Sequence, residues 1–171
     1  MPHEEKRTIV ITGGSRGIGR AVCLCFARPG NRIFFNYHSA AAAAEETCRR
    51  VAEAGGQATG VRVDVAAEDA VVEFFDTVLA DTGRIDVLVN NAGITRDGLL
   101  VRMKGRQWDD VIAVNLKGTF NCMKVAGRTM MRQRSGRIIN ITSVVGVTGN
   151  PGQSNYVASK AGIIGLTKAA A

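Results

Sequence analysis

The chain has 171 residues, of which 46% are hydrophobic and 22% charged, so it can form one globular domain with a sizeable core. A formal net charge of +7 favours anionic ligands or acidic partners. We predict no nucleic-acid binding and no metal site, because no basic motif is interleaved with aromatic residues and no zinc-ligand spacing occurs. No apolar run approaches the roughly 18 to 20 residues that span a bilayer, so we also predict no membrane span.

The chain reads as an alternation of short β-branched segments with longer helical patterns. The predicted strands are Thr8–Thr12, Arg32–Tyr37, Ala58–Asp64, Val87–Asn90 and Arg137–Thr142. The predicted helices are Gly17–Arg28, a helix capped by Ser39 that runs to Glu53, roughly Glu68–Asp81, Trp108–Arg134 and Asn155–Ala171. This alternation predicts an α/β fold, a Rossmann-type doubly wound parallel sheet with helices on both faces. Ligands of such sheets bind beyond the carboxyl ends of the strands.

The two chain ends and the cysteines add three expectations. The last predicted helix stops at Ala171 without a cap, so we expect residues 1–171 to be a single dinucleotide-binding and catalytic domain that is incomplete at its C-terminus. The segment before Arg7 has no apolar signal-peptide region. All four cysteines are interpreted as small core residues in a reducing compartment, which predicts a cytoplasmic protein. They are Cys23, Cys25, Cys48 and Cys122.

A glycine-rich turn, Thr12–Gly19, joins the first predicted strand to the first predicted helix. Its glycines have the spacing G-x-x-x-G-x-G, which by itself also fits an ordinary tight turn. Because a strand precedes it and a helix follows, its backbone N–H groups can hold a pyrophosphate. The candidate cofactor residues here are Gly13, Ser15, Arg16, Gly17, Ile18 and Gly19.

The choice between the two nicotinamide cofactors depends on the end of the second strand. An acidic residue about 20 positions after the turn would bind the ribose 2′-hydroxyl, and residues 34–39 contain none. Arg16 lies in the turn, where it can meet a 2′-phosphate. These two features favour NADPH. His38 fits either a second cofactor contact or an ordinary loop residue.

Further cofactor candidates follow the third and fourth strands. Asp64 and Val65 can bracket the adenine, although an aspartate at a strand end is also a common helix cap. Asn90, Ala92 and Gly93 can shape the cofactor cleft, although asparagine and glycine are also good turn residues.

Four polar residues form a candidate reaction centre: Asn115, Ser143, Tyr156 and Lys160. Tyr156 and Lys160 are four apart and so share one face of a helix. An ammonium beside a phenol stabilises the phenolate, which makes the phenol a usable proton donor near neutral pH. Each residue has an ordinary structural explanation when taken alone, but their convergence on one sheet edge favours catalysis. We interpret Ser143 as a hydrogen-bond donor to a carbonyl, because no histidine near it could activate a nucleophile.

These residues together resemble the short-chain dehydrogenase/reductase family, and the matching motifs run across nearly the whole chain. Three segments resemble its 3-oxoacyl-[acyl-carrier-protein] reductase branch: residues 91–97, 135–146 and 149–156. The resemblance implies that Tyr156 gives a proton to the carbonyl oxygen and that Ser143 orients the carbonyl. It also implies that Lys160 assists the tyrosine and holds the nicotinamide ribose. Asn115 would hold a water in a proton relay.

The resemblance has further implications for partners and substrate. It implies a homotetramer, the strand order 3-2-1-4-5, further C-terminal strands, and an acidic acyl carrier protein as partner. The resemblance points to Arg134 as a docking residue for the carrier, and Arg128, Arg132 and Arg134 can form a basic face that fits either this docking or an ordinary solvated helix surface. The leading hypothesis is NADPH-dependent reduction of 3-oxoacyl thioesters in fatty-acid biosynthesis. The alternatives are reduction of another carbonyl substrate (acetoacetyl-CoA, a sugar or a steroid) and a non-catalytic dinucleotide-binding fragment.

Overall fold

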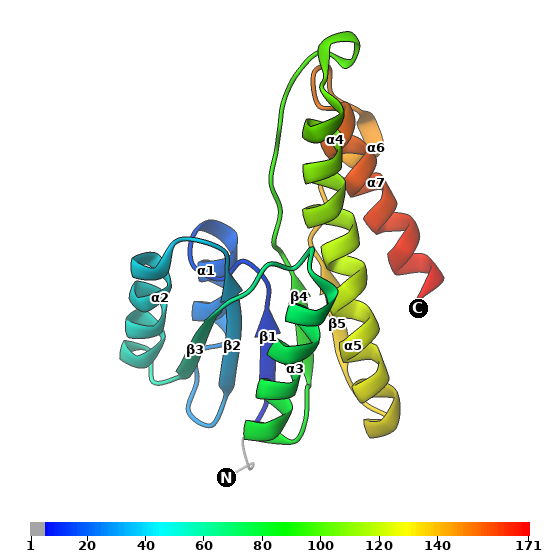
Figure 1. Cartoon of the computed structure of the whole chain (residues 1–171). Coiled ribbons are helices and arrows are strands. Elements are labelled where there is room, and N and C mark those ends of the chain that lie inside the picture. Colours follow the sequence, from blue (N-terminus) through cyan, green and yellow to red (C-terminus); the bar gives the residue numbers. More distant parts are fainter. Residues whose placement is uncertain (1–5) are drawn as a thin grey trace.

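The computed structural model describes residues 6–171 and shows a parallel five-stranded sheet between layers of helices (Figure 1). The strands run in the order β3-β2-β1-β4-β5, which confirms the predicted Rossmann-type α/β class and the expected strand order. Their bounds are β1 (Thr8–Ile11), β2 (Arg32–Tyr37), β3 (Gln57–Arg62), β4 (Val87–Asn90) and β5 (Arg137–Asn140).

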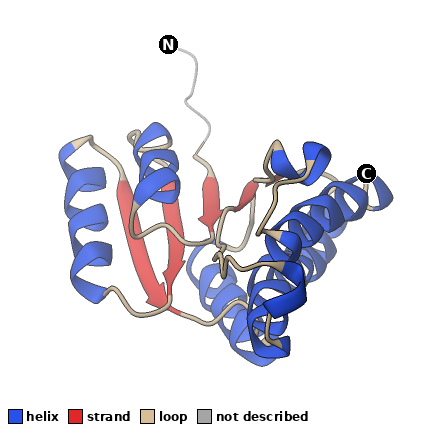
Figure 2. Cartoon of the chain, turned by 90° about the horizontal axis from the view of Figure 1, so that it is seen from above, coloured by secondary structure: helices blue, strands red, loops and turns tan. Residues whose placement is uncertain are grey.

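Helices connect successive strands and cover both faces of the sheet (Figure 2). They are α1 (Gly17–Cys25), α2 (Ala41–Glu53), α3 (Glu68–Thr82), α4 (Gly105–Val111), α5 (Gly118–Gln133), α6 (Val145–Thr148) and α7 (Ser154–Ala169). A 3₁₀ turn occupies Leu100–Arg102, and a π-helical segment, Ile112–Lys117, joins α4 to α5. Within residues 6–171, no helix has the length and apolarity needed to cross a membrane.

Two hydrophobic clusters form the core, one on each face of the sheet. Strand β1 supplies both, because alternate side chains of a strand point to opposite faces. Ile9 and Ile11 pack with residues of α1 and α2, whereas Val10 packs with residues of α3 and α5. All four residues of β1 are buried, so the middle of the sheet is a rigid base for the loops at its carboxyl end.

Several predicted boundaries were wrong for local reasons. Helix α1 ends at Cys25, not Arg28, because Pro29 disfavours helical backbone at the residue before it. This leaves Cys25 exposed, which corrects its interpretation as a core residue. Helix α2 begins after Ala40, and no side chain caps it, so Ser39 is not its N-cap. Three strands end one or two residues early, within the usual uncertainty of such boundaries.

The long helical region predicted from Trp108 begins at Gly105 and is not one regular helix. Residues 112–117 adopt the wider π-helical turn, and Asn115 lies inside it. Such segments are rare, and they frequently occur at functional sites.

Candidate active site

A cavity of about 810 Å³ lies along the carboxyl ends of the strands. Its walls come from the glycine turn, the end of β2, and the segments after β3 and β4. Its size is that of a site for a small organic molecule. Among the cofactor residues predicted for these segments, the cavity is lined by Gly13, Ser15, Arg16, Ile18, Asp64, Val65, Ala92 and Gly93. Gly17, Gly19 and Asn90 do not line it.

The glycine turn needs glycine where helix α1 approaches strand β1. Gly13 has a φ of 70°, a backbone conformation that other residues rarely adopt. A Cβ atom on Gly19 would lie 2.1 Å from the backbone oxygen of Gly13, so no side chain fits there. Gly19 therefore sets the close approach of the helix, and Gly13 sets the direction of the turn.

Two asparagines that we had not predicted as site residues hold the turn in place. Asn36, at the end of β2, accepts a hydrogen bond from the Gly13 N–H (3.0 Å) and donates one to the Val63 carbonyl (2.8 Å). Asn91 donates from its side chain to the Thr12 and Gly13 carbonyls (3.0 and 3.2 Å). In the sequence, the sign of this role is that each asparagine is a polar residue at the end of an apolar strand.

The charged residues of the cavity wall are mostly positive. Three arginines and two aspartates line the cavity, which leaves an excess of one positive charge suited to an anionic ligand: Arg16, Arg96, Arg106, Asp64 and Asp110. The Asp64 carboxylate accepts a hydrogen bond from the Ala66 N–H (2.9 Å), so it shapes its own turn as well as the wall. His38 also lines the cavity. Among the described residues, no cluster of side chains has the composition of a metal site.

Lys160 lies below the ring of Tyr156, on the face of α7 that both residues share. Its Nζ atom is 5.6 Å from the ring centroid and donates a hydrogen bond to the Ile141 carbonyl (2.8 Å). Lys160 is 4% exposed, and this burial lowers the pKa of its ammonium group. The structure thus places a buried cation beside a half-buried phenol.

Asn115 ties three segments together from the π-helical turn. Its side chain accepts from the Ile94 N–H (2.8 Å) and donates to the Ile94 carbonyl (3.1 Å) and the Ser159 hydroxyl (3.0 Å). A Cβ atom on Gly93 would lie 3.3 Å from Asn115 Oδ1 and 3.8 Å from Lys160 Nζ. Gly93 lines the cavity, so both residues flank the cavity at this glycine.

Ser143 follows β5 in a segment held against α7. The Thr142 hydroxyl donates to the backbone oxygen of Lys160 (2.9 Å), and Ser143 Oγ accepts from the Val145 N–H (3.4 Å). The structure therefore brings the segments of all four predicted catalytic residues together. None of the four lines the cavity itself; they lie beyond Gly93.

Asn155 also belongs to this region, and its sequence neighbourhood gave no signal for it. Its side chain donates to the carbonyls of Arg96 and Gln107 (both 2.9 Å) and accepts from the Tyr156 N–H (2.8 Å). It is fully buried. Asn155 therefore fixes the start of α7, and with it Tyr156, against the loop that follows β4.

The predicted residue Asn90 does not line the cavity. Its side chain donates to the side-chain oxygen of Asn140 on the neighbouring strand (2.8 Å). This contact joins the ends of β4 and β5, and a contact of Asn90 with the cofactor stays a prediction.

Comparison with known proteins agrees with this geometry. The family model described as short chain dehydrogenase matches residues 7–171. The proteins named 3-oxoacyl-[acyl-carrier-protein] reductase FabG from Staphylococcus epidermidis and Staphylococcus aureus are 50% and 51% identical to the chain over 165 residues. These matches cover 96% of the chain and 68% and 67% of the relatives.

A further relative comes from Synechocystis sp. and is named 3-oxoacyl-[acyl-carrier-protein] reductase. It is 51% identical over 162 residues, which cover 95% of the chain and 66% of the relative. The chain thus spans about two thirds of the length of these relatives. With a family model that matches almost every residue, the chain belongs to the short chain dehydrogenase family.

Proposed function

We propose that the chain reduces 3-oxoacyl thioesters carried by acyl carrier protein to 3-hydroxyacyl thioesters, with NADPH, in fatty-acid biosynthesis. The observation that carries this proposal is the meeting of cavity and reaction centre at Gly93. The relatives, at 50–51% identity, are named for this reduction.

The residues of the cavity fit a dinucleotide. The glycine turn lines the cavity at the start of α1, where backbone N–H groups can hold a phosphate, and the excess of positive charge favours an anion. Arg16 lines the cavity, and residues 34–39, at and just after the end of β2, contain no acidic residue that would favour NADH. Asn36 is occupied with the backbone of Gly13 and Val63. We therefore assign the cofactor as NADPH, which when bound supplies a hydride.

We assign a different role to each of the four residues of the reaction centre. Tyr156 donates the proton to the carbonyl oxygen, and the hydroxyl of Ser143 orients that carbonyl. Lys160, with Nζ 5.6 Å from the ring centroid, stabilises the phenolate that remains. Asn115 keeps the loop at Ile94 and the helix at Ser159 in register, and its predicted role in a water relay stays a prediction.

An acidic carrier would meet a basic surface formed by Arg128, Arg132 and Arg134, all of which are exposed. These residues lie near the C-terminal end of α5, next to the start of β5, and thus at the opposite end of the sheet from the cavity (Figure 1). The tetramer and the cytoplasmic location remain predictions.

Turnover measurements test the proposed function. We expect oxidation of NADPH, followed at its nicotinamide absorbance, to depend on acetoacetyl thioester and to be faster with carrier-linked substrate. Sugars and steroids should give no comparable rate. If only sugars or steroids are turned over, the chain is a reductase of another carbonyl substrate. If NADPH binds but no carbonyl compound is turned over, the non-catalytic alternative is correct.

A further inference from the structure

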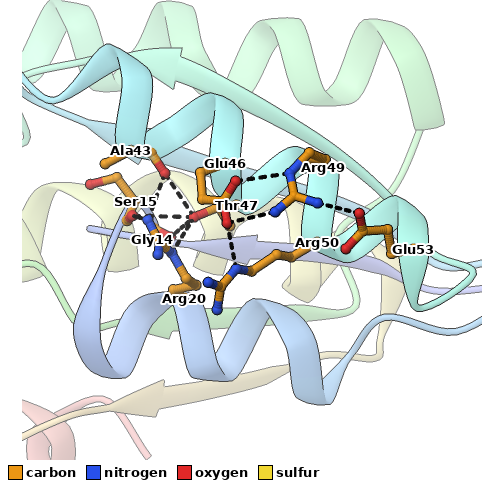
Figure 3. Close-up of polar contacts among 9 residues, drawn as sticks. All are labelled: Gly14, Ser15, Arg20, Ala43, Glu46, Thr47, Arg49, Arg50 and Glu53. Atoms are coloured by element: carbon orange, nitrogen blue, oxygen red, sulfur yellow. Dashed lines mark hydrogen bonds and ion pairs between the residues drawn. The ribbon is translucent and has the colours of Figure 1, made fainter.

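Arg20 in α1 and Thr47 in α2 make a network of hydrogen bonds with the glycine turn (Figure 3). The Thr47 hydroxyl is fully buried and lies 3.2 Å from each of the Gly14 and Ser15 carbonyl oxygens. Arg20 donates from Nη2 to the Ser15 carbonyl (2.6 Å) and from Nε to the Thr47 hydroxyl (2.9 Å). Two side chains from different helices therefore converge on two consecutive carbonyls of the turn.

These contacts fix the direction of the neighbouring N–H groups. The carbonyl of one residue and the N–H of the next share a planar trans peptide, in which they point in opposite directions. The described residues contain no cis peptide bond. Because the Gly14 and Ser15 carbonyls face Thr47 and Arg20, the N–H groups of Ser15 and Arg16 point away from α2.

Those two N–H groups have no hydrogen-bond partner among the residues that the structure describes. Among the hydrogen bonds of residues 6–171, none uses the backbone N–H of Ser15 or Arg16. Ser15 is only 7% exposed, and a buried N–H group without a partner is rare in a folded protein. Both residues line the cavity, so a ligand there can accept these hydrogen bonds.

We propose that Arg20 and Thr47 are positioning residues that aim the Ser15 and Arg16 N–H groups at the pyrophosphate of the bound dinucleotide. This inference rests on the proposed function. The hydroxyl of Thr47 accepts from Arg20, and its single proton has three acceptors in reach: the Gly14 and Ser15 carbonyls (3.2 Å each) and the Ala43 carbonyl of its own helix (3.1 Å). The positive charge of Arg20 strengthens this arrangement, because hydrogen bonds from an ionised donor are the stronger ones.

A simpler role would be to join α1 to α2, and the same helix offers a control for it. On its exposed side, α2 carries ion pairs of Glu46 with Arg49 and Arg50, and of Arg49 with Glu53 (Figure 3). The two arginines lower the pKa of Glu46 to about 2. None of these ion pairs involves the turn. Glu46→Gln therefore disturbs α2 without disturbing the carbonyls.

The experiment compares Thr47→Val, Thr47→Ser and Glu46→Gln with the unaltered chain. NADPH is titrated by its fluorescence, and adenosine 2′-monophosphate, which has no pyrophosphate, is titrated by NMR. We expect Thr47→Val to raise the Kd for NADPH about three- to tenfold, the effect of a lost hydrogen bond or two. Thr47→Ser should restore most of the affinity, Glu46→Gln should leave it unchanged, and no variant should change binding of the monophosphate.

Other results would overturn the inference in distinguishable ways. If the unaltered chain does not bind NADPH, the proposed function fails, and the inference fails with it. If the unaltered chain binds and Thr47→Val binds equally well, only the positioning role is wrong. Parallel losses for both ligands and in Tm would mean that the network only joins two helices. Should Thr47→Val not fold, Arg20→Met removes the donors to both Thr47 and Ser15, and the same outcomes apply.

Discussion

The two ends of the proposed site are built in different ways. At the phosphate end, the glycine turn lines the cavity at Gly13, Ser15, Arg16 and Ile18, and the side chains of Asn36 and Thr47 contact the backbone of that turn. At the proposed reaction end, the four predicted catalytic groups are side chains, and they come from the π-helical segment, the loop after β5 and α7. Altering the phosphate end should therefore change binding, whereas altering the reaction end should change chemistry.

The surroundings of the two ends also differ. The phosphate end rests on β1, whose residues are all buried, in the middle of the sheet. The reaction end rests on β5 at the edge of the sheet, where Ile139 is 44% exposed. Close by, Val144 and Val147 are 73% and 77% exposed. The reaction end therefore depends on specific contacts, such as those of Asn155, more than on burial in the core.

The largest effect is expected from Tyr156→Phe, which keeps the ring and removes the proton. Turnover should fall by about 10²- to 10⁴-fold, the contribution of a general acid, while the Kd for NADPH changes little. Steady-state rates and a fluorescence titration of the same preparation measure both quantities. Near-normal turnover would mean that Tyr156 is not the proton donor. A loss of NADPH binding as large as the loss of turnover would mean that the phosphate end and the reaction end do not differ as described.

At the phosphate end, Arg16→Ala should weaken binding of NADPH about tenfold, since a charged hydrogen bond to a phosphate is lost. Binding of NADH should change much less, because NADH has no 2′-phosphate. Titration of both cofactors measures the ratio. An equal loss for both cofactors would mean that Arg16 contacts the pyrophosphate. No loss for either cofactor would mean that its side chain contacts only solvent.

The motifs that make up the proposed site could be predicted from the sequence better than the contacts that hold them in place. The glycine turn, the apolar run of β4 and the Tyr156–Lys160 pair carry local signals, the parallel sheet was expected from the alternation of strands and helices, and the strand order from the family resemblance. Asn115 could be selected as a site residue, but its partner Ile94 lies 21 residues earlier. The π-helical turn could not be predicted, because it depends on how this asparagine meets the loop after β4.

At the phosphate end, the roles of Arg20 and Thr47 likewise could not be predicted from the sequence. Thr47 lies in an alanine- and glutamate-rich helix where nothing local marks it. Its role depends on the packing of α2 beside the glycine turn, 32 and 33 residues away in the sequence. In the sequence, Asn36 mattered only as one of the residues that are not acidic, although its side chain accepts a hydrogen bond from the Gly13 N–H.

Arg134→Glu tests a third region, which touches neither end of the site. If the basic surface at Arg128, Arg132 and Arg134 binds the carrier, KM for carrier-linked substrate should rise roughly twofold to fivefold, the scale of an exposed charge pair. KM for a small thioester should stay the same. Equal changes for both substrates would count against docking there, and the surface would then be ordinary solvated arginine.

The smallest effect concerns the buried charge at the reaction end. Burial lowers the pKa of Lys160, so the folded protein releases this proton at a lower pH than the unfolded chain does. Stability of the unaltered chain should therefore rise with pH up to about 10.5, the ordinary value, relative to Lys160→Met, which has no such proton. Denaturant unfolding of both proteins between neutral pH and that value measures the difference. A constant difference would mean that the ammonium is not desolvated.

The central claim, that a dinucleotide lies along the carboxyl ends of the strands and reaches Gly93, is tested most directly by titrating the unaltered chain with NADPH. We predict saturable binding of one NADPH per chain, tighter than binding of NADH, with amide NMR shifts at Ser15, Arg16 and Gly93. Absence of binding, or binding that shifts none of these amides, would contradict the account.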